Sequence, residues 1–155
     1  MPDSVLESVT LSEQMGNRDP IDRFPAVVHP GLDIGTLSVR EVEGDLVECE
    51  IEFEFYLSNR RDDIVCTVSA SFRLCYRMVP LDGLRERKRW ASTVVLRDAW
   101  PYWRTYLANT LTLMGLPPSR LPPQPAPPLF RTAREAFDLT RELAHANEDD
   151  RDPDD

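Results

Sequence analysis

Four carboxylates alternate with apolar residues in the middle of the chain and form its most regular set of ionisable side chains. This set, called here the glutamate row, consists of Glu48, Glu50, Glu52 and Glu54. Side chains two positions apart point to the same face of a β-strand. The row is therefore either the solvated face of an antiparallel sheet or, where cations opposite it are too few, a docking surface for a basic partner. We expect Arg73 and Arg77 on the following strand to neutralise part of it.

Patterns typical of catalysis or of a metal site do not occur in the sequence. His29 and His145 are too far apart to form a metal-binding motif, and no glycine is followed by lysine, as a P-loop requires. We therefore expect no enzyme, no cofactor and no metal. One enzyme alternative stays open, a hotdog-like acyl hydrolase in which Asp98 is the only candidate carboxylate, and it rests on analogy of fold alone.

Composition and charge indicate one soluble domain with a preference for basic partners. The chain has 155 residues, 41% apolar and 29% charged, and a formal net charge of -9. Binding to phosphates requires a basic surface. The chain has one short basic cluster, Arg85, Arg87, Lys88 and Arg89, and acidic residues outnumber it. We therefore expect no nucleic-acid partner. We also expect no membrane insertion, because no secretory signal and no long apolar stretch are visible.

The three cysteines, Cys49, Cys66 and Cys75, lie inside strand-like patterns and include no close-spaced pair. We interpret them as reduced core thiols, which predicts a cytoplasmic protein.

Period-two alternation predicts three antiparallel strands, over residues 35–42, 46–58 and 64–79. Residues 1–34 show no sustained period and are expected to form a largely irregular N-terminal arm. Residues 84–96 are ambiguous between a short helix and a fourth strand, and the β-branched residues near 93–96 favour an extended end.

A long helix is predicted over residues 99–114, with Asp98 as its cap, Pro101 in its first turn and Gly115 closing it. Its apolar residues follow two stripes, of which a single sheet can cover only one. The first stripe contains Trp100, Trp103, Leu107, Leu111 and Met114, and the second contains Tyr102, Tyr106 and Leu113.

Seven of the fourteen prolines lie in residues 117–128, which should form a stiff crossing segment. A last helix is predicted over residues 132–146, where Thr132 and Glu135 form a capping box. From residue 148 to residue 155 six of eight residues are acidic, and this tail is expected to be disordered.

Residues 100–130, WPYWRTYLANTLTLMGLPPSRLPPQPAPPLF, resemble the C-terminal half of the SecB family of protein-export chaperones. In that family an aromatic residue followed by Pro-Tyr-x-Arg opens a long helix, a glycine ends it, and a proline-rich loop with an apolar-aromatic pair leads into a terminal helix. The matching positions here are Trp100, Pro101, Tyr102, Arg104, Gly115, Pro117, Pro118, Leu121, Pro123, Leu129 and Phe130.

The resemblance implies an α+β fold over residues 35–147: a four-stranded antiparallel sheet followed by the long helix, the crossing loop and the C-terminal helix. It also implies an ATP-independent chaperone, or holdase, that binds unfolded polypeptides for protein export. Relatives of SecB that serve the antitoxins of toxin-antitoxin systems make a dedicated antitoxin chaperone the alternative. The family assembles as a dimer of dimers, so we expect a homotetramer.

The same resemblance suggests roles for particular residues. Candidate peptide-binding residues are Trp100, Tyr102, Trp103, Tyr106, Leu116 and Leu121, although the aromatic group would equally serve as helix core. Candidate oligomer contacts are Leu107, Leu111, Leu113 and Met114. The glutamate row would dock the translocase motor SecA, since the family binds SecA through an acidic sheet face.

Overall fold

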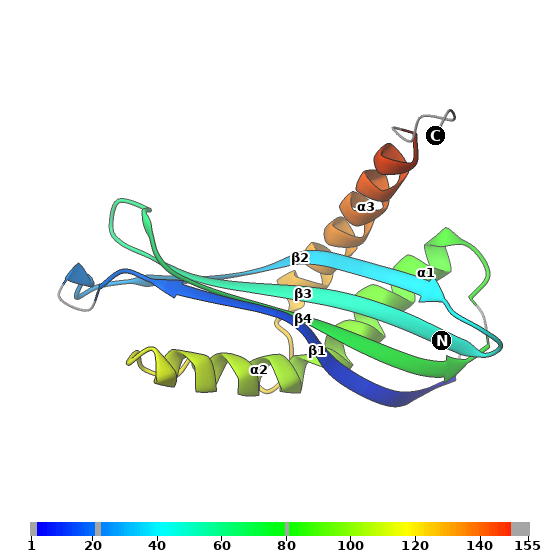
Figure 1. Ribbon diagram of the computed structural model, residues 1–155, viewed down its shortest axis with the longest axis horizontal. Helices are drawn as coiled ribbons and strands as arrows, with labels where there is room; N and C mark the ends of the chain where they lie inside the picture. The colour runs from blue at the N-terminus through cyan, green and yellow to red at the C-terminus, as the bar shows by residue number, and fades with distance from the viewer. Residues whose placement is uncertain (1–2, 21–22, 80, 150–155) are drawn as a thin grey trace, which may run out of the picture.

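One antiparallel sheet carries all of the helices on a single face (Figure 1). The structure, a computed structural model, describes residues 3–20, 23–79 and 81–149. The strands lie in the order β1-β4-β3-β2, so β1 and β2 are the edges. The elements are β1 (Ser4–Arg18), β2 (His29–Glu41), β3 (Leu46–Ser58), β4 (Ile64–Met78), α1 (Leu84–Trp90), a π-helical segment (Ala91–Val95), α2 (Leu96–Leu113) and α3 (Pro127–Asp149).

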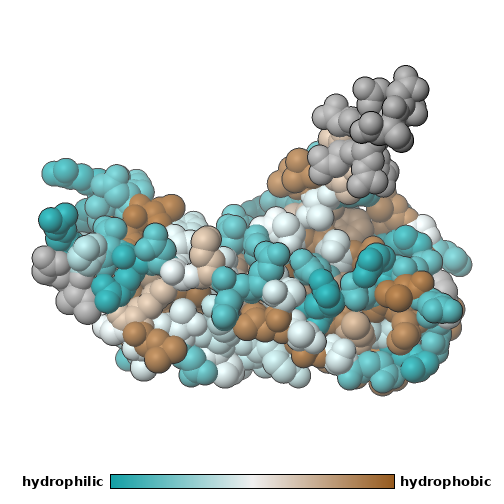
Figure 2. Space-filling view, in the orientation of Figure 1, coloured by the Kyte–Doolittle hydropathy of each residue, from teal (hydrophilic) through white to brown (hydrophobic). Residues whose placement is uncertain are grey.

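The central hairpin of β3 and β4 agrees with the period-two prediction almost residue for residue. On β3 the apolar residues Val47, Cys49, Ile51 and Phe53 are each at most 1% exposed, and the glutamates between them point to the opposite face. The helices cover only the apolar face, because the open face carries charged side chains that stay in contact with water. In Figure 2 hydrophilic and hydrophobic side chains interleave over the face turned to the viewer.

The N-terminal residues form the longest departure from the sequence prediction. Residues 4–18, expected to be irregular, pair with β4 along their whole length as β1. Register shifts between Leu6 and Ser8 and between Leu11 and Glu13 change which residues face the core. A β-bulge adds one residue to a strand and so reverses the phase of the alternation beyond it. Two such shifts within one strand removed the periodic signal.

Strand β2 starts earlier than predicted, at His29 instead of residue 35, and ends at Glu41. Here too a register shift lies inside the strand, between Ile34 and Leu37, which pair with Phe53 and Ile51 of β3. The phase of the apolar residues changes across this shift, and for this reason only the second half of the strand was recognisable.

Residues 84–113 form one continuous helical run, so the extended end expected near residues 93–96 is wrong. Val95 and Leu96 are fully buried in the core beside Trp90 and Ala91. The β-branched residues cost a helix only about 0.5 kcal/mol each, which this burial outweighs. Local propensity favoured a strand, and packing against the sheet decides for a helix.

The predicted helix start at Asp98 and Pro101 is also wrong, since both residues lie inside the helical run. The side chain of Pro101 is exposed, and Asp98 accepts a hydrogen bond from the Tyr76 hydroxyl at 2.9 Å instead of capping the helix. The aromatic-Pro-Tyr motif therefore occupies the middle of a helix of this chain and does not open one.

The end of α2 is as predicted. Gly115 has a φ of 75°, and its N–H donates to the carbonyl of Thr112 at 3.0 Å while Leu116 N–H donates to Leu111 at 2.9 Å. These two bonds form a Schellman motif, in which the glycine adopts the left-handed conformation without steric cost.

Helix α3 begins at Pro127, five residues before the predicted capping box. Thr132 lies within it and donates to the carbonyl of Pro128 at 3.3 Å. Ala133, Ala136 and Phe137 are buried against the sheet side, but Leu143 is 57% exposed because the helix projects beyond the sheet (Figure 1). The predicted acidic tail overlaps the end of α3, and residues 150–155 lie outside the described part of the chain.

Candidate functional site

An apolar groove lies between the segment before β2, the end of β3 and the loop that follows α2. Its volume is about 350 Å³. Phe55 and Leu111 are buried beneath it, and the half-buried side chains of Phe24, Leu57 and Leu121 rise around it. The full lining is Phe24, Val28, Pro30, Phe55, Leu57, Leu111, Leu116, Pro117, Pro118, Ser119, Arg120 and Leu121. We call this surface the apolar groove.

The loop that forms one wall of the apolar groove is held by local chemistry. The left-handed Gly115 turns the chain back at the end of α2, and Pro117 and Pro118 restrict the backbone that follows. Further along, the carbonyl of Pro122 accepts a hydrogen bond from the Trp100 indole Nε1 at 2.9 Å. These restraints present the apolar side chains of the loop in a fixed position.

Two of the predicted peptide-binding residues, Leu116 and Leu121, line the apolar groove. Trp100 and Trp103 do not, because they are 1% and 0% exposed in the core. The Trp103 ring stacks on Phe53 with 5.3 Å between ring centroids, so both tryptophans hold α2 on the sheet and offer no surface to a ligand.

The two tyrosines of the predicted set lie on α2 outside the lining of the apolar groove. Tyr102 is 47% exposed, and Tyr106 is half-buried with its ring 6.1 Å from that of Trp103. The six residues are therefore divided between groove, core and helix surface.

Sequence reasoning missed ten of the twelve residues that line the apolar groove: Phe24, Val28, Pro30, Phe55, Leu57, Leu111, Pro117, Pro118, Ser119 and Arg120. The sequence did hold a signal for Phe55 and Leu57, because they are the last apolar residues in the alternating pattern of β3. They lie where the sheet extends past the helices. Phe24 and Val28 lie in a short apolar stretch interrupted by prolines, and no periodic pattern distinguishes them.

The glutamate row lies on the open face of the sheet and is only partly neutralised. Glu48 is within 2.6 Å of Arg40 and 3.6 Å of Arg73, and Glu50 is 3.3 Å from Arg73. Arg73 thus has the predicted role. Arg77 instead pairs with Glu7 at 3.1 Å and Asp45 at 2.9 Å, and these partners raise the pKa of its guanidinium.

Glu52 and Glu54 form the end of the row that has no arginine partner among the described residues. Burial, reinforced by the charge of Glu54, raises the pKa of Glu52, although a hydrogen bond from Ser71 at 3.5 Å opposes the shift. Gly35 on β2 lies directly against this pair, because a Cβ there would come within 2.1 Å of Glu52 Oε1. The open face thus keeps a concentrated negative charge at one place.

The four predicted oligomer contacts also differ in environment. Leu107 and Leu111 are in the core, at 0% and 1% exposed, because they belong to the stripe that the sheet covers. Leu113 is 89% exposed. Met114 is half-buried against β1, where its Cε would lie 2.5 Å from a Cβ built on Gly16.

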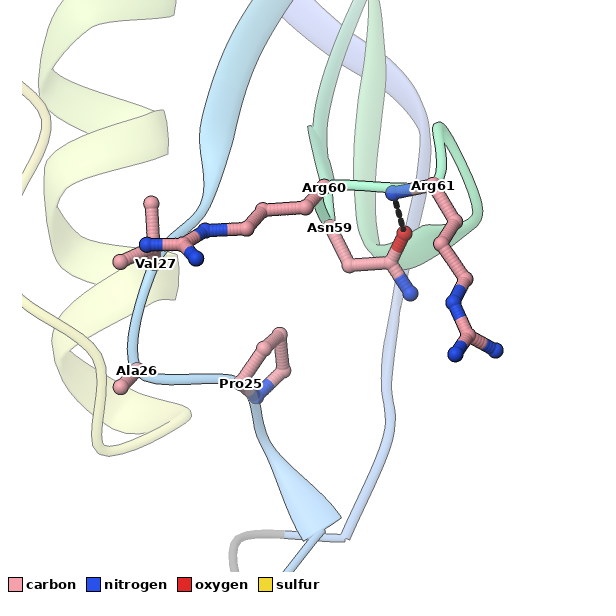
Figure 3. A pocket seen from close by; sticks show the side chains of 6 residues that line it. All are labelled: Pro25, Ala26, Val27, Asn59, Arg60 and Arg61. Carbon is pink, nitrogen blue, oxygen red and sulfur yellow. Dashed lines mark hydrogen bonds between the residues drawn. The ribbon is translucent and has the colours of Figure 1, made fainter.

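A second pocket, of about 410 Å³, lies at the tip of the sheet between residues 25–27 and the β3–β4 turn (Figure 3). Arg60 extends toward Val27, whereas Arg61 points away, and Arg61 N–H donates to Asn59 Oδ1 at 2.8 Å. Asp62 and Asp63 follow the two arginines in the same turn, so this end of the sheet carries charges of both signs.

The remaining ionisable side chains were compared with the requirements of a metal site and of a reactive thiol. No group of three His, Cys, Asp or Glu side chains is placed to hold a metal ion there. All three cysteines are free thiols, and burial raises the pKa of Cys49 and of Cys66. In the part of the chain that the structure describes, no helix is both long enough and apolar enough to cross a membrane.

Comparisons with known proteins identify the fold. No family model and no curated protein matches the sequence. The structure is similar to that of the Mycobacterium tuberculosis Rv1957 SecB-like chaperone in complex with a ChAD peptide from the Rv1956 HigA1 antitoxin, with a TM-score of 0.65 and 16% identity over 80% of this chain and 92% of that one. A Streptococcus agalactiae protein of unknown function gives a TM-score of 0.40 and 7% identity over 79% of this chain and 98% of that one. The four-stranded antiparallel sheet followed by a long helix and a C-terminal helix is thus a SecB-like α+β fold.

Proposed function

We propose that this protein is a passive chaperone that binds apolar segments of unfolded polypeptides in the apolar groove. The observation that carries the proposal is the groove itself, an apolar depression of about 350 Å³ walled by aromatic and aliphatic side chains and a proline-stiffened loop. Such side chains gain free energy from burial without demanding a particular ligand sequence. A rigid wall lowers the entropy cost of binding.

The similarity to a SecB-like chaperone supports this proposal at the level of fold. In the proposed mechanism the client segment lies over Phe55 and Leu111 and is enclosed by Phe24 and Leu121. The chaperone binds the unfolded state and not the native one, so by mass action it lowers the concentration of the species that aggregates. Release follows from dilution or capture by another partner and requires no nucleotide.

Suppression of aggregation tests the proposal. A chemically unfolded, aggregation-prone protein is diluted into buffer with an equimolar amount of this protein, and light scattering is followed over time. We expect the wild type to delay scattering and a Leu116→Ser/Leu121→Ser variant to lose most of the delay. Leu139→Ser/Leu143→Ser is the matched control, because it removes two leucines that are 54% and 57% exposed on α3, away from the groove.

Circular dichroism establishes that both variants remain folded. Equal activity of the two double variants would contradict the groove assignment, and a wild type without any effect on scattering would contradict the chaperone proposal itself.

A dedicated antitoxin chaperone is the second candidate, because the similar structure contains a peptide from an antitoxin. In this version the groove is the same and the client is one labile protein. A toxin-antitoxin pair encoded next to this gene, with toxicity released on deletion of the gene, would support it. Survival of the deletion strain without toxicity would exclude it for that pair.

For the export role expected from the SecB resemblance, we propose that Glu52 and Glu54 dock the motor SecA, since Glu48 and Glu50 are already paired with arginines. Binding of SecA to the wild type and its loss in Glu52→Gln/Glu54→Gln, but not in Glu48→Gln/Glu50→Gln, would support this docking site. Equal binding by all three proteins would reject it.

We also propose that the chain assembles as a homotetramer through the uncovered stripe of α2. Leu113 and Tyr102 on this stripe are 89% and 47% exposed. Exposed apolar side chains that continue along one helix face are typical of an interface.

A further inference from the structure

We infer that the cleft between α1 and α3 binds an acidic segment of a client polypeptide, which adds a charge preference to the proposed chaperone function on which this inference rests. The cleft has a volume of about 450 Å³ and is lined by four cations, Arg85, Lys88 and Arg89 of α1 and Arg134 of α3. We call it the basic cleft. In Figure 1, α1 lies toward the end of the sheet opposite to the β3–β4 turn.

The cations of the basic cleft are poorly neutralised within the chain. Lys88 forms an ion pair with Asp138 of α3. Arg85, Arg89 and Arg134 have no ion pair among the described residues, and Glu86 accepts instead from the backbone N–H of Asp82 at 3.2 Å. Because like charges four residues apart destabilise a helix, the Arg85 and Arg89 pair favours an anion bound between them.

The chemistry of the lining favours carboxylates. Three guanidinium groups each present a planar fork of N–H donors that matches a carboxylate, and two helices hold them around one space. Several carboxylates spaced along an extended peptide could each meet one cation, whereas a single small anion would leave most of the cleft unfilled.

A nucleic acid is the less favourable polyanion for this cleft. The chain has a net charge of -9, and the glutamate row adds a negative face to the same small protein. A long phosphate backbone would experience this repulsion along its length, whereas a short acidic segment needs only the local positive potential. None of the described residues that line the cleft is aromatic, so they offer no stacking platform for bases.

A second pocket that α1 and α3 also line suits the apolar residues that flank such a segment. This pocket, of about 220 Å³, uses Leu84 of α1, Phe137 and Ala144 of α3, and Leu37 and Val39 of β2. Because α1 and α3 line both spaces, one extended chain can place an apolar side chain in the pocket and carboxylates in the cleft.

Two matched peptides test the inference on the full-length protein. They share one apolar sequence, and one carries four flanking glutamates where the other carries four glutamines. By fluorescence anisotropy we expect the wild type to bind the glutamate peptide about 10-fold more tightly at low salt, with the difference shrinking at high salt. Arg85→Gln/Arg134→Gln should remove this preference and leave the affinity for the glutamine peptide unchanged.

Arg60→Gln/Arg61→Gln is the control, because it removes the same charge from the other end of the sheet and should keep the preference. The inference is overturned if the wild type binds both peptides equally, if the control loses the preference as well, or if a 12-nucleotide DNA competes as well as the glutamate peptide. If neither peptide binds at all, the proposed chaperone function fails as well as the inference. If both peptides bind equally, only the inference fails, so the two failures are distinguishable.

Discussion

The rings of Trp103 and Phe53 lie stacked in the core, 5.3 Å apart and inclined by only 9°. This contact joins the long helix to the central strand β3, and both side chains are 0% exposed. The aromatic motif of α2 is thus first of all the means by which the helix is held on the sheet.

Replacement of Trp103 by alanine should lower the free energy of unfolding by about 3–5 kcal/mol, since it leaves a large cavity beneath the sheet. Leu139→Ala is the control and should change it by no more than about 0.5 kcal/mol, because Leu139 is 54% exposed on α3. Urea denaturation followed by circular dichroism measures both. Similar losses for the two variants would contradict the assignment of Trp103 to the core.

Tyr76→Phe should destabilise the fold by about 1–2 kcal/mol, because the buried Tyr76 hydroxyl donates to Asp98 Oδ2 at 2.9 Å. Burial and the nearby Asp98 raise the pKa of Tyr76, so the phenol stays a neutral donor. Asp98→Asn keeps an acceptor oxygen and should cost less. Thermal unfolding measures both variants, and a larger loss of stability for Asp98→Asn than for Tyr76→Phe would contradict this prediction.

The stability contributed by Glu52 should depend on pH in the direction set by its raised pKa. A carboxyl whose folded pKa exceeds the ordinary 4.5 binds its proton more tightly when folded, so its contribution is complete below pH 4.5 and is lost as the pH rises through the folded pKa. Glu52→Gln should therefore stabilise the protein at pH 7, by no more than about 0.5 kcal/mol for a partly exposed group.

The gain in stability from Glu52→Gln should disappear below about pH 4, because the glutamate is then protonated and as neutral as the glutamine that replaces it. Glu48→Gln provides the opposite case, since it removes ion pairs with Arg40 and Arg73 and should lower stability at pH 7. Urea midpoints measured across this pH range test both signs, and a loss of stability for Glu52→Gln at pH 7 would contradict the prediction.

Leu113→Asp should dissociate the proposed homotetramer, because a charge would enter the apolar contact made by a side chain that is 89% exposed in the single chain. Light scattering should give about four times the 17.8 kDa of one chain for the wild type and less for the variant. Leu139→Asp on α3 should keep the wild-type mass. A wild type that is already monomeric would end the proposal.

Gly115→Ala should cost about 1 kcal/mol, since the residue has a φ of 75° at the end of α2. If this turn also fixes the loop of the apolar groove, the variant should suppress aggregation less well even where it remains folded. Wild-type stability for Gly115→Ala, measured by urea denaturation, would contradict the structural role of the glycine.

The sequence by itself determined the elements whose periodicity is unbroken. The alternation of Phe53 with Glu52 and Glu54 is a local property of an extended chain, so it predicted both the buried and the charged face of β3. In the same way, Gly115 predicted the end of α2 because a left-handed residue is a local requirement.

Only the tertiary structure decided the rest. The bulges of β1 are defined by its pairing with β4, and the helix at Val95 and Leu96 forms because the core buries them against local preference. Phe24 and Leu121 lie 97 positions apart in the sequence and meet in one groove. Their contact depends on the path of the whole chain around the sheet, and no local pattern carries that information.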